Sequence, residues 1–214
     1  MLREALRECG LIAILRGVMP NEVLQIGAQL YSIGFRIIEV PLNSPQPIES
    51  ITNLRKGLPA DCQVGAGTVY LTSQVEAVKG AGGSLVVMPH CSTAVIGAAR
   101  AAKLDVLPGV ATPTEAFTSF AAGITTLKFF PADHLGPTTL KAWLSVLPRE
   151  VELIPVGGIC PENLDSFVSA GATGFGLGSA LYQPGMSVAD IVERGKSFMA
   201  AWNLVKRRRK SHRN

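Results

Sequence analysis

The sequence has no apolar run of about 18 residues, so we expect no membrane-spanning helix. Its first nine residues carry both charge signs and no apolar run, which predicts that no signal peptide is present. The four cysteines, Cys9, Cys62, Cys91 and Cys160, are widely separated and form no CxxC pair, which excludes a zinc ribbon and a dithiol redox motif. Scattered, reduced thiols are typical of a cytosolic protein, and we expect this chain to be cytoplasmic.

Histidine is scarce, and its positions argue against a metal site. His90, His134 and His212 form no HxH or HExxH pattern, and carboxylates are few where the predicted strands end. The sequence also lacks a dinucleotide-binding fingerprint, because Gly-Ala-Gly-Thr at 65–68 has no third glycine at the required spacing. We therefore expect no metal and no cofactor, so that any carbonyl chemistry needs a side chain as its electron sink.

Charge is sparse and unevenly placed. Charged residues make up 17% of the chain and hydrophobic residues 47%, which predicts a large core in a single domain over residues 1–205. The segment 206–214 holds six of the 20 basic residues, and we expect this basic tail to be flexible and solvated. Nucleic-acid binding is the alternative, but no groove-reading element accompanies the tail. We expect neither a nucleic acid nor a membrane as partner.

What the sequence does contain is a repeated unit: a short apolar run, a turn and an amphipathic stretch. The apolar runs cover residues 11–15, 36–40, 63–67, 85–88, 105–107, 126–130, 152–156 and 174–177. Eight such runs alternating with helices predict an α/β fold of the (β/α)8 TIM barrel type. An open doubly wound sheet is the alternative, although no run shows the alternation of a half-exposed edge strand.

Several of the expected helices carry end signals. Thr72 and Ser92 are predicted N-caps, and Thr112 with Glu115 forms a predicted capping box. Two further helices are expected from about residue 136 to 147, starting at Gly-Pro, and from about residue 187 to 205.

The active site of such a barrel forms where its strands end, so residues at these points are the candidates. They are Arg16, Asn43, Ser44, Thr68, Pro89, His90, Gly157, Gly158, Gly178 and Ser179. The glycine-rich ends of the last two strands offer backbone N–H groups and a hydroxyl, which predicts a phosphate site, although tight turning alone also accounts for glycines. Arg16 is suited to bind a carboxylate through two hydrogen bonds, or is simply a surface arginine.

Two ionisable residues stand inside predicted strands. Lys128 lies in Thr-Leu-Lys-Phe-Phe at 126–130, and Glu39 lies in Ile-Ile-Glu-Val-Pro at 37–41. Burial lowers the pKa of a lysine, and a neutral amine is a nucleophile for carbonyl carbon. A buried glutamate of raised pKa transfers protons at neutral pH. The alternatives are a lysine whose ammonium reaches solvent at the strand end, and a structural ion pair between the two residues.

Over most of its length, from about residue 11 to residue 182, the sequence resembles the class I aldolases of the 2-keto-3-deoxy-6-phosphogluconate family. The matching motifs are Ile-Ala-Ile-Leu-Arg-Gly at 12–17, Ile-Glu-Val-Pro-Leu-Asn-Ser-Pro at 38–45, Gly-Ala-Gly-Thr-Val at 65–69, Lys-Phe-Phe-Pro at 128–131 and Pro-Val-Gly-Gly-Ile at 155–159. Together these motifs are highly specific, and they favour the nucleophilic Lys128 over the solvent-reaching one. The resemblance also implies a homotrimer.

The resemblance implies a mechanism. Lys128 attacks the C2 ketone of a sugar acid phosphate, and Glu39 moves protons, through water, while the C3–C4 bond breaks. The implied products are pyruvate and glyceraldehyde 3-phosphate. Arg16 and Thr68 are the candidates for binding the substrate carboxylate. The candidates for binding the phosphate are Gly157, Gly158, Gly178 and Ser179.

Two departures from the gluconate enzymes bear on the configuration at C4 of the substrate. Those enzymes resemble Leu-Arg-Thr-Pro where this chain has Leu-Asn-Ser-Pro, and they carry a threonine where it has Val156. Because a lost hydroxyl donor changes stereochemical preference, we expect the galactonate-configured substrate and take Val156, Asn43 and Pro89 as specificity positions. His90, after Pro89, departs from the asparagine expected in the galactonate group.

Three alternatives to this substrate and reaction stay open. The first is an aldolase for the gluconate-configured substrate, or for both epimers. The second is a barrel isomerase or epimerase that uses Glu39 without a Schiff base. The third is a protein that only binds phosphometabolites or nucleic acid, which would leave Lys128 and Glu39 without a role.

Overall fold

The structure is a computed structural model that describes residues 2–211. Its strands are β1 (Leu11–Ile14), β2 (Ile37–Pro41), β3 (Gln63–Gly67), β4 (Leu85–Val87), β5 (Asp105–Leu107), β6 (Gly109–Val110), β7 (Thr126–Phe129), β8 (Glu152–Pro155) and β9 (Phe175–Leu177). Its helices are α1 (Leu2–Glu8), α2 (Val23–Ser32), α3 (Pro47–Gly57), α4 (Thr72–Gly80), α5 (Thr93–Ala101), α6 (Pro113–Ala121), α7 (Ala132–Leu144), the 3-10 turn η1 (Pro161–Asn163), α8 (Leu164–Ala170) and α9 (Val188–Ser211).

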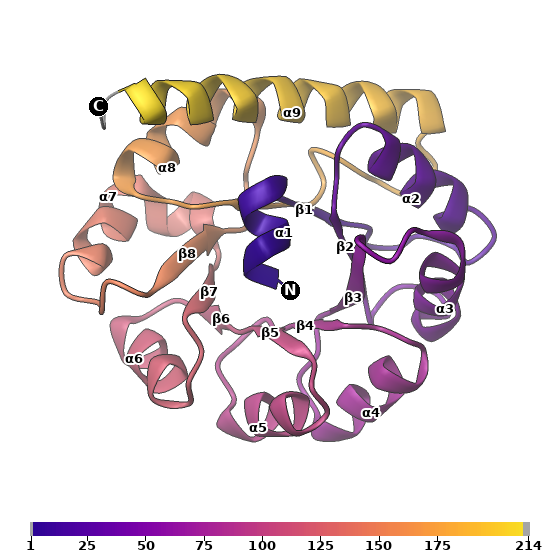
Figure 1. Ribbon diagram of the computed structural model, residues 1–214, viewed down its shortest axis with the longest axis horizontal. Coiled ribbons are helices and arrows are strands. Elements are labelled where there is room, and N and C mark those ends of the chain that lie inside the picture. Colours follow the sequence, from indigo (N-terminus) through magenta and orange to yellow (C-terminus); the bar gives the residue numbers. More distant parts are fainter. Residues whose placement is uncertain (1, 212–214) are drawn as a thin grey trace.

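Every strand pairing in the described part of the chain is parallel. One sheet has the order β5-β4-β3-β2-β1-β9, and the other has the order β6-β7-β8. The strands curl around a common interior and the helices lie outside them (Figure 1). The predicted α/β class is confirmed, with its parallel strands curled at least into a half-barrel.

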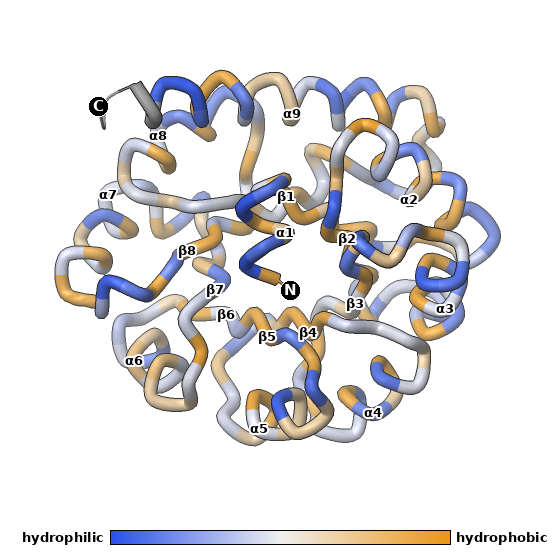
Figure 2. The backbone as a smooth tube through the Cα atoms, viewed as in Figure 1, coloured by the Kyte–Doolittle hydropathy of each residue, from blue (hydrophilic) through white to orange (hydrophobic). Residues whose placement is uncertain are grey.

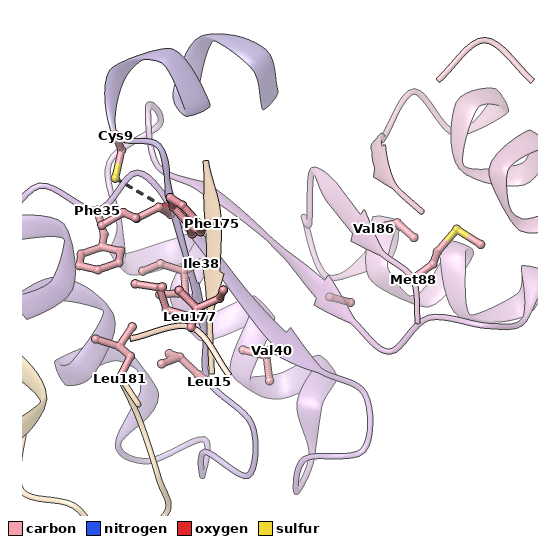
Figure 3. Packing of buried hydrophobic residues seen from close by; sticks show 14 of the residues in the cluster. Cys9, Leu15, Phe35, Ile38, Val40, Val86, Met88, Phe175, Leu177 and Leu181 are labelled. Atoms are coloured by element: carbon pink, nitrogen blue, oxygen red, sulfur yellow. Dashed lines mark hydrogen bonds between the residues drawn. The ribbon is translucent and has the colours of Figure 1, made fainter. Parts of the chain in front are cut away.

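The two faces of each strand contribute to different apolar clusters, because successive side chains of a strand point in opposite directions. In β1, Leu11 and Ala13 belong to the large cluster between strands and helices, whereas Ile12 belongs to a second cluster inside the curl. In β2, Ile38 is in the first cluster and Ile37 in the second. Figure 3 shows part of the first cluster, and Figure 2 shows how apolar residues concentrate on the strands.

Helix α1 covers one end of the interior. Its apolar residues Leu2, Ala5 and Leu6 belong to the inner cluster. The strand residues of this cluster are Ile12, Ile37, Leu85, Val87, Leu107 and Ile154. In Figure 1, α1 lies across the middle of the ring of strands. Because apolar side chains fill this end, the interior can meet solvent only at the opposite end, where the strands terminate.

The helix-start signals were read correctly at two positions and wrongly at a third. Ser92 accepts a hydrogen bond from the N–H of Val95, and the capping box of Thr112 and Glu115 is present. Thr72, however, is the first residue of α4 and not its cap. Just before the helix, the backbone N–H groups of Tyr70 and Leu71 both donate to the side-chain oxygen of Gln74. The hydrogen bonds at the start of α4 therefore go to Gln74 and not, as predicted, to Thr72.

Two helices differ from their predicted bounds. Helix α7 begins at Ala132, earlier than the predicted start near residue 136, because a first turn precedes a kink at Gly136 (φ 74°, ψ 165°). Helix α9, predicted to end near residue 205, continues to Ser211. The ammonium of Lys206 donates to the backbone carbonyls of Arg7 and Glu8, at 3.3 Å each, and so ties the extension to α1. Residues 212–214 of the predicted basic tail lie outside the described part of the chain.

Within residues 2–211, no helix is both long enough and apolar enough to cross a membrane. All four cysteines lie in this part of the chain and are free thiols, with Cys9 and Cys62 buried.

Replacement of Phe198 by alanine is expected to destabilise the fold strongly. This side chain is 1% exposed in α9, so its removal leaves a cavity and should lower the free energy of unfolding by about 3–5 kcal/mol. Leu204→Ala is the matched control on the same helix, because Leu204 is 51% exposed and should change that free energy by less than about 0.5 kcal/mol. Urea unfolding followed by circular dichroism measures both. Equal effects of the two substitutions would contradict the packing of α9 against its neighbouring helices.

Candidate active site

The carboxyl ends of the strands surround a cavity of about 410 Å³. It is lined by Ile14, Arg16, Thr68, Pro89, Lys128, Phe130, Val156, Gly157, Gly158, Ile159, Cys160, Gly178, Ser179 and Ala180. The structure thus gathers into one cavity residues that come from six different strands or strand ends. Of the residues given a role in binding, catalysis or specificity, only Glu39 and Asn43 are outside this described lining, and the strand-end candidates Ser44 and His90 are outside it as well.

Lys128 points into the interior from the middle of β7. Its neighbours Leu127 and Phe129 both belong to the outer apolar cluster, so strand alternation places Lys128 on the inner face. The residue is 5% exposed, and its Nζ lies 4.6 Å from the centre of the Phe130 ring. Burial lowers the pKa of this lysine, and the charge of Arg16 lowers it further, whereas Glu39 opposes the shift. The side chain is therefore largely buried, and the amine is biased toward its neutral, nucleophilic form.

Glu39 lies on the inner face of β2, two residues after Ile37 of the inner cluster. It is 2% exposed, and its Oε2 atom has no hydrogen-bond partner among the described residues. Burial raises the pKa of Glu39 to about 7, although the charges of Lys128 and Arg16 act in the opposite direction. A carboxyl group with this pKa exchanges protons readily near neutral pH.

The neighbouring strand β3 leaves room for this carboxyl group. Gly65 pairs with Glu39 in the sheet, and Gly67 follows on the same face. A Cβ atom at residue 67 would collide with Oε2 of Glu39. Glycine is therefore required at this position by the close approach of the carboxylate. The sequence motif at 65–69 contained this glycine, but its relation to Glu39 depends on strand register and was not predicted.

Arg16, Thr68 and Asn43 meet at the rim of the cavity. The Arg16 guanidinium donates from Nη1 to Asn43 Oδ1 at 2.5 Å, and from Nη1 and Nη2 to Thr68 Oγ1 at 3.5 and 3.4 Å. Thr68, at the end of β3, has a positive φ of 57°, which is strained for a β-branched residue and is found mostly at functional sites. The two residues predicted to bind a carboxylate are thus neighbours.

The glycine-rich ends of β8 and β9 form the adjoining wall, because β9 pairs with β1, the strand that precedes Arg16. Gly157 and Gly158 both have positive φ, at 102° and 64°. The side chain of Asn163 braces this loop, because it donates to the Gly158 carbonyl at 2.8 Å and accepts from the Cys160 N–H at 3.1 Å. Ser179 is exposed at the end of β9. This wall presents backbone groups and a hydroxyl, without a carboxylate in the described lining, as an anion requires.

Sequence reasoning missed several residues of the cavity. Phe130 lies two positions after Lys128, so strand alternation would have placed it on the same face. Ile14 could have been found in the same way, since it follows Ile12 on the inner face of β1. Cys160 lies in an irregular loop, and no pattern in the sequence marks it.

The histidine, cysteine and carboxylate side chains of the described residues do not cluster as metal ligands do. Within residues 2–211, no group of three or more histidine, cysteine, aspartate or glutamate side chains could hold a metal ion. His90 is exposed next to Pro89 and does not line the cavity, and His212 lies outside the described residues.

Comparison with known proteins gives a consistent result. The family model of KDPG and KHG aldolases matches residues 2–195. A probable 2-dehydro-3-deoxy-6-phosphogalactonate aldolase of Rhizobium meliloti is 46% identical, over 91% of this chain and 92% of that protein. The 2-dehydro-3-deoxy-6-phosphogalactonate aldolase of Escherichia coli is 42% identical, over 90% of this chain and 94% of that protein. Among solved structures, a native KDPGal structure superposes with a TM-score of 0.90 at 41% identity, over 92% of this chain and 96% of that one.

The family match extends over nearly the whole chain, and both relatives are covered over more than nine-tenths of their length. The predicted resemblance is confirmed. The chain belongs to the KDPG and KHG aldolase family.

Proposed function

We propose that this chain is a class I aldolase, a carbon–carbon lyase that cleaves 2-dehydro-3-deoxy-6-phosphogalactonate to pyruvate and glyceraldehyde 3-phosphate. The observation that carries this proposal is the pair of Lys128 and Glu39 on the inner faces of two strands, each with its pKa shifted by burial toward the neutral form. Both relatives compared above act on this galactonate derivative by their names.

Lys128 supplies the electron sink. Its amine attacks the C2 ketone of the substrate, and loss of water from the carbinolamine gives a protonated Schiff base. When the C3–C4 bond breaks, its electron pair moves into the enamine formed with this iminium, and the aldehyde product leaves. Protonation at C3 and hydrolysis of the imine then release pyruvate and regenerate the free amine. Every step uses protein groups and water.

Glu39 is the proton carrier for these steps. Its pKa near 7 allows it to take the proton of the C4 hydroxyl and to return protons during dehydration and hydrolysis. The Oε2 atom has no partner among the described residues, so a water molecule bound there would satisfy it and extend its reach toward the cavity.

Two anion sites orient the sugar acid. At the rim, Arg16 and Thr68 are proposed to bind the C1 carboxylate. On the adjoining wall, the phosphate is proposed to bind the backbone N–H groups and the hydroxyl of Gly157, Gly158, Gly178 and Ser179. Binding at both ends would hold the C2 ketone between them, beside Lys128.

Specificity at C4 is assigned to Val156 and Pro89, which both line the cavity. Val156 follows β8 and is nearly buried, so it offers an apolar contact where a threonine would offer a hydroxyl. This difference favours the galactonate-configured substrate. An aldolase for the gluconate-configured substrate, or for both epimers, is the second candidate, because the same lysine and glutamate would serve it.

The proposal includes the architecture in its finer detail. We take the strands to close into an eight-stranded (β/α)8 barrel in which β5 and β6 count as one strand interrupted at Pro108. The isolated parallel bridge between Val156 and Gly176 supports closure at the seam between β8 and β9. We also propose a cytoplasmic homotrimer, with one domain over residues 1–205 and an appended basic segment at 206–214.

Substitution of Lys128 by methionine should abolish cleavage and covalent capture of pyruvate. Methionine keeps the buried methylene groups, so the fold should survive while the nucleophile is lost. The measurement is borohydride reduction in the presence of pyruvate, followed by peptide mass spectrometry. Lys141→Met, at an exposed lysine of α7, is the control and should retain the mass added at Lys128. Turnover or labelling that persists in Lys128→Met would assign the Schiff base to another group.

Substitution of Glu39 by glutamine should lower kcat by a factor on the order of 10²–10⁴ and change the pH profile. Because burial raises the pKa of Glu39 to about 7, the basic form predominates above pH 7 and the wild-type rate should fall as the pH drops below it. Glutamine cannot titrate, so this acid limb should disappear. Glu193→Gln, at an exposed position of α9, should keep the wild-type profile. An unaltered rate and acid limb in Glu39→Gln would remove the proton-transfer role.

The epimer preference should depend on Val156. In a coupled pyruvate-release assay, the wild type should favour the galactonate phosphate over the gluconate phosphate. Val156→Thr restores a hydroxyl beside the substrate and should shift the ratio of the two kcat/KM values toward the gluconate epimer by about tenfold or more. Val146→Thr, at a residue that is 62% exposed, serves as control. If Val156→Thr leaves the ratio unchanged, the specificity assignment is wrong and the aldolase assignment stands.

A further inference from the structure

We propose that Asn43 is a positioning residue, which holds the Arg16 guanidinium at the rim of the cavity instead of contacting C4 of the substrate. Its effect would then fall on every substrate with a 2-keto carboxylate, including pyruvate, and not on the choice between epimers. The inference rests on the proposed function, because it takes Arg16 to be the group that binds the carboxylate.

The first argument is the geometry of the contacts. Asn43 does not line the cavity in the described part of the chain, whereas Arg16 does. The contact of Asn43 Oδ1 with Arg16 Nη1, at 2.5 Å, is much shorter than the contacts of Thr68 Oγ1 with the same guanidinium, at 3.4 and 3.5 Å. The amide of Asn43 therefore determines the orientation of the guanidinium more than the hydroxyl of Thr68 does.

The second argument is that the next residue holds the backbone of the same loop. Ser44 is nearly buried, and its Oγ accepts a hydrogen bond from the N–H of Gly17 at 2.9 Å. Gly17 has a positive φ of 83°, and a side chain there would collide with Pro184. The loop after β2 thus fixes both the side chain of Arg16 and the backbone that follows it. Holding both the side chain and the backbone beside it is an effective way to fix the orientation of a long, flexible side chain such as that of Arg16.

The third argument is charge. The amide of Asn43 is neutral, so it fixes the guanidinium without cancelling its positive charge. A guanidinium has five N–H donors, and the contacts with Asn43 and Thr68 leave donors for a substrate carboxylate. A carboxylate at position 43 would instead pair with Arg16 and compete with an anionic substrate. The residue type at position 43 therefore fits a positioning role.

The test measures Asn43→Ala in two assays. The first determines the pyruvate concentration that gives half-maximal borohydride trapping at Lys128, and the second determines kcat/KM on the galactonate and gluconate phosphates. Loss of this exposed hydrogen bond to Arg16 should raise the half-trapping concentration by about threefold to tenfold. The two kcat/KM values should fall by a similar factor, so that their ratio stays within about twofold of the wild type.

A double substitution separates positioning from a general structural effect. In an Arg16→Lys background, the fork of donors that Asn43 orients is absent, so Asn43→Ala should change trapping by less than about twofold. Asn203→Ala, at an exposed amide of α9, is the matched control and should leave trapping and the epimer ratio at wild-type values. A full effect of Asn43→Ala in the Arg16→Lys background would show that it acts through the fold, which would overturn the proposal.

The remaining outcomes are also decisive. An altered epimer ratio with unaltered pyruvate trapping would show that Asn43 contacts the C4 group of the substrate directly, and would refute the positioning role. No change in either assay would show that the contact with Arg16 has no functional consequence. Failure of the wild type itself to trap pyruvate would instead refute the Schiff-base function, and with it the premise of this inference.

Discussion

The chemistry of the candidate site depends on the burial of two ionisable side chains inside a curled parallel sheet. Removing a charge from water costs several kcal/mol, so Glu39 and Lys128 are each driven toward their neutral forms. Their mutual attraction works against this shift but does not cancel it. If these two residues served only to stabilise the fold, apolar residues of similar size would do so better. The environment that makes the pair costly is the one that makes an amine nucleophilic and a carboxyl group able to exchange protons at neutral pH.

The rest of the fold maintains this environment. Helix α1 fills one end of the interior with Leu2, Ala5 and Leu6, and Lys128 lines the cavity at the other end, where the strands terminate. Strand β3 turns Gly67 toward the carboxyl group of Glu39, and Oε2 occupies the place that a side chain at residue 67 would need. The second feature is made by a strand position, and the core strands are among the most rigid parts of a protein.

The sequence predicted the α/β class and the place of the site because both follow from local periodicity. Lys128 and Glu39 interrupt apolar runs, and the other candidates were found by reading strand ends alone. What could not be predicted depends on contacts between distant segments. The room that Gly67 leaves for Glu39 is a matter of register, and the extension of α9 past residue 205 is held by contacts of Lys206 with α1. The early start of α7 was missed because Gly136 and the proline after it signal a helix start of their own.

The groups proposed to carry out the reaction and the groups proposed to hold the substrate lie on different parts of the fold. The groups that would make and break bonds lie on β2 and β7, where a displacement would disturb the sheet itself. The groups that would hold the ends of the substrate, Arg16 and the loop at Gly157 and Gly158, follow strands and are braced by side chains such as Asn43. A substitution in a brace changes where an anion is held without changing the pKa values at the centre. Such a substitution would therefore alter how tightly any 2-keto carboxylate is held, while the lysine-based reaction stays the same.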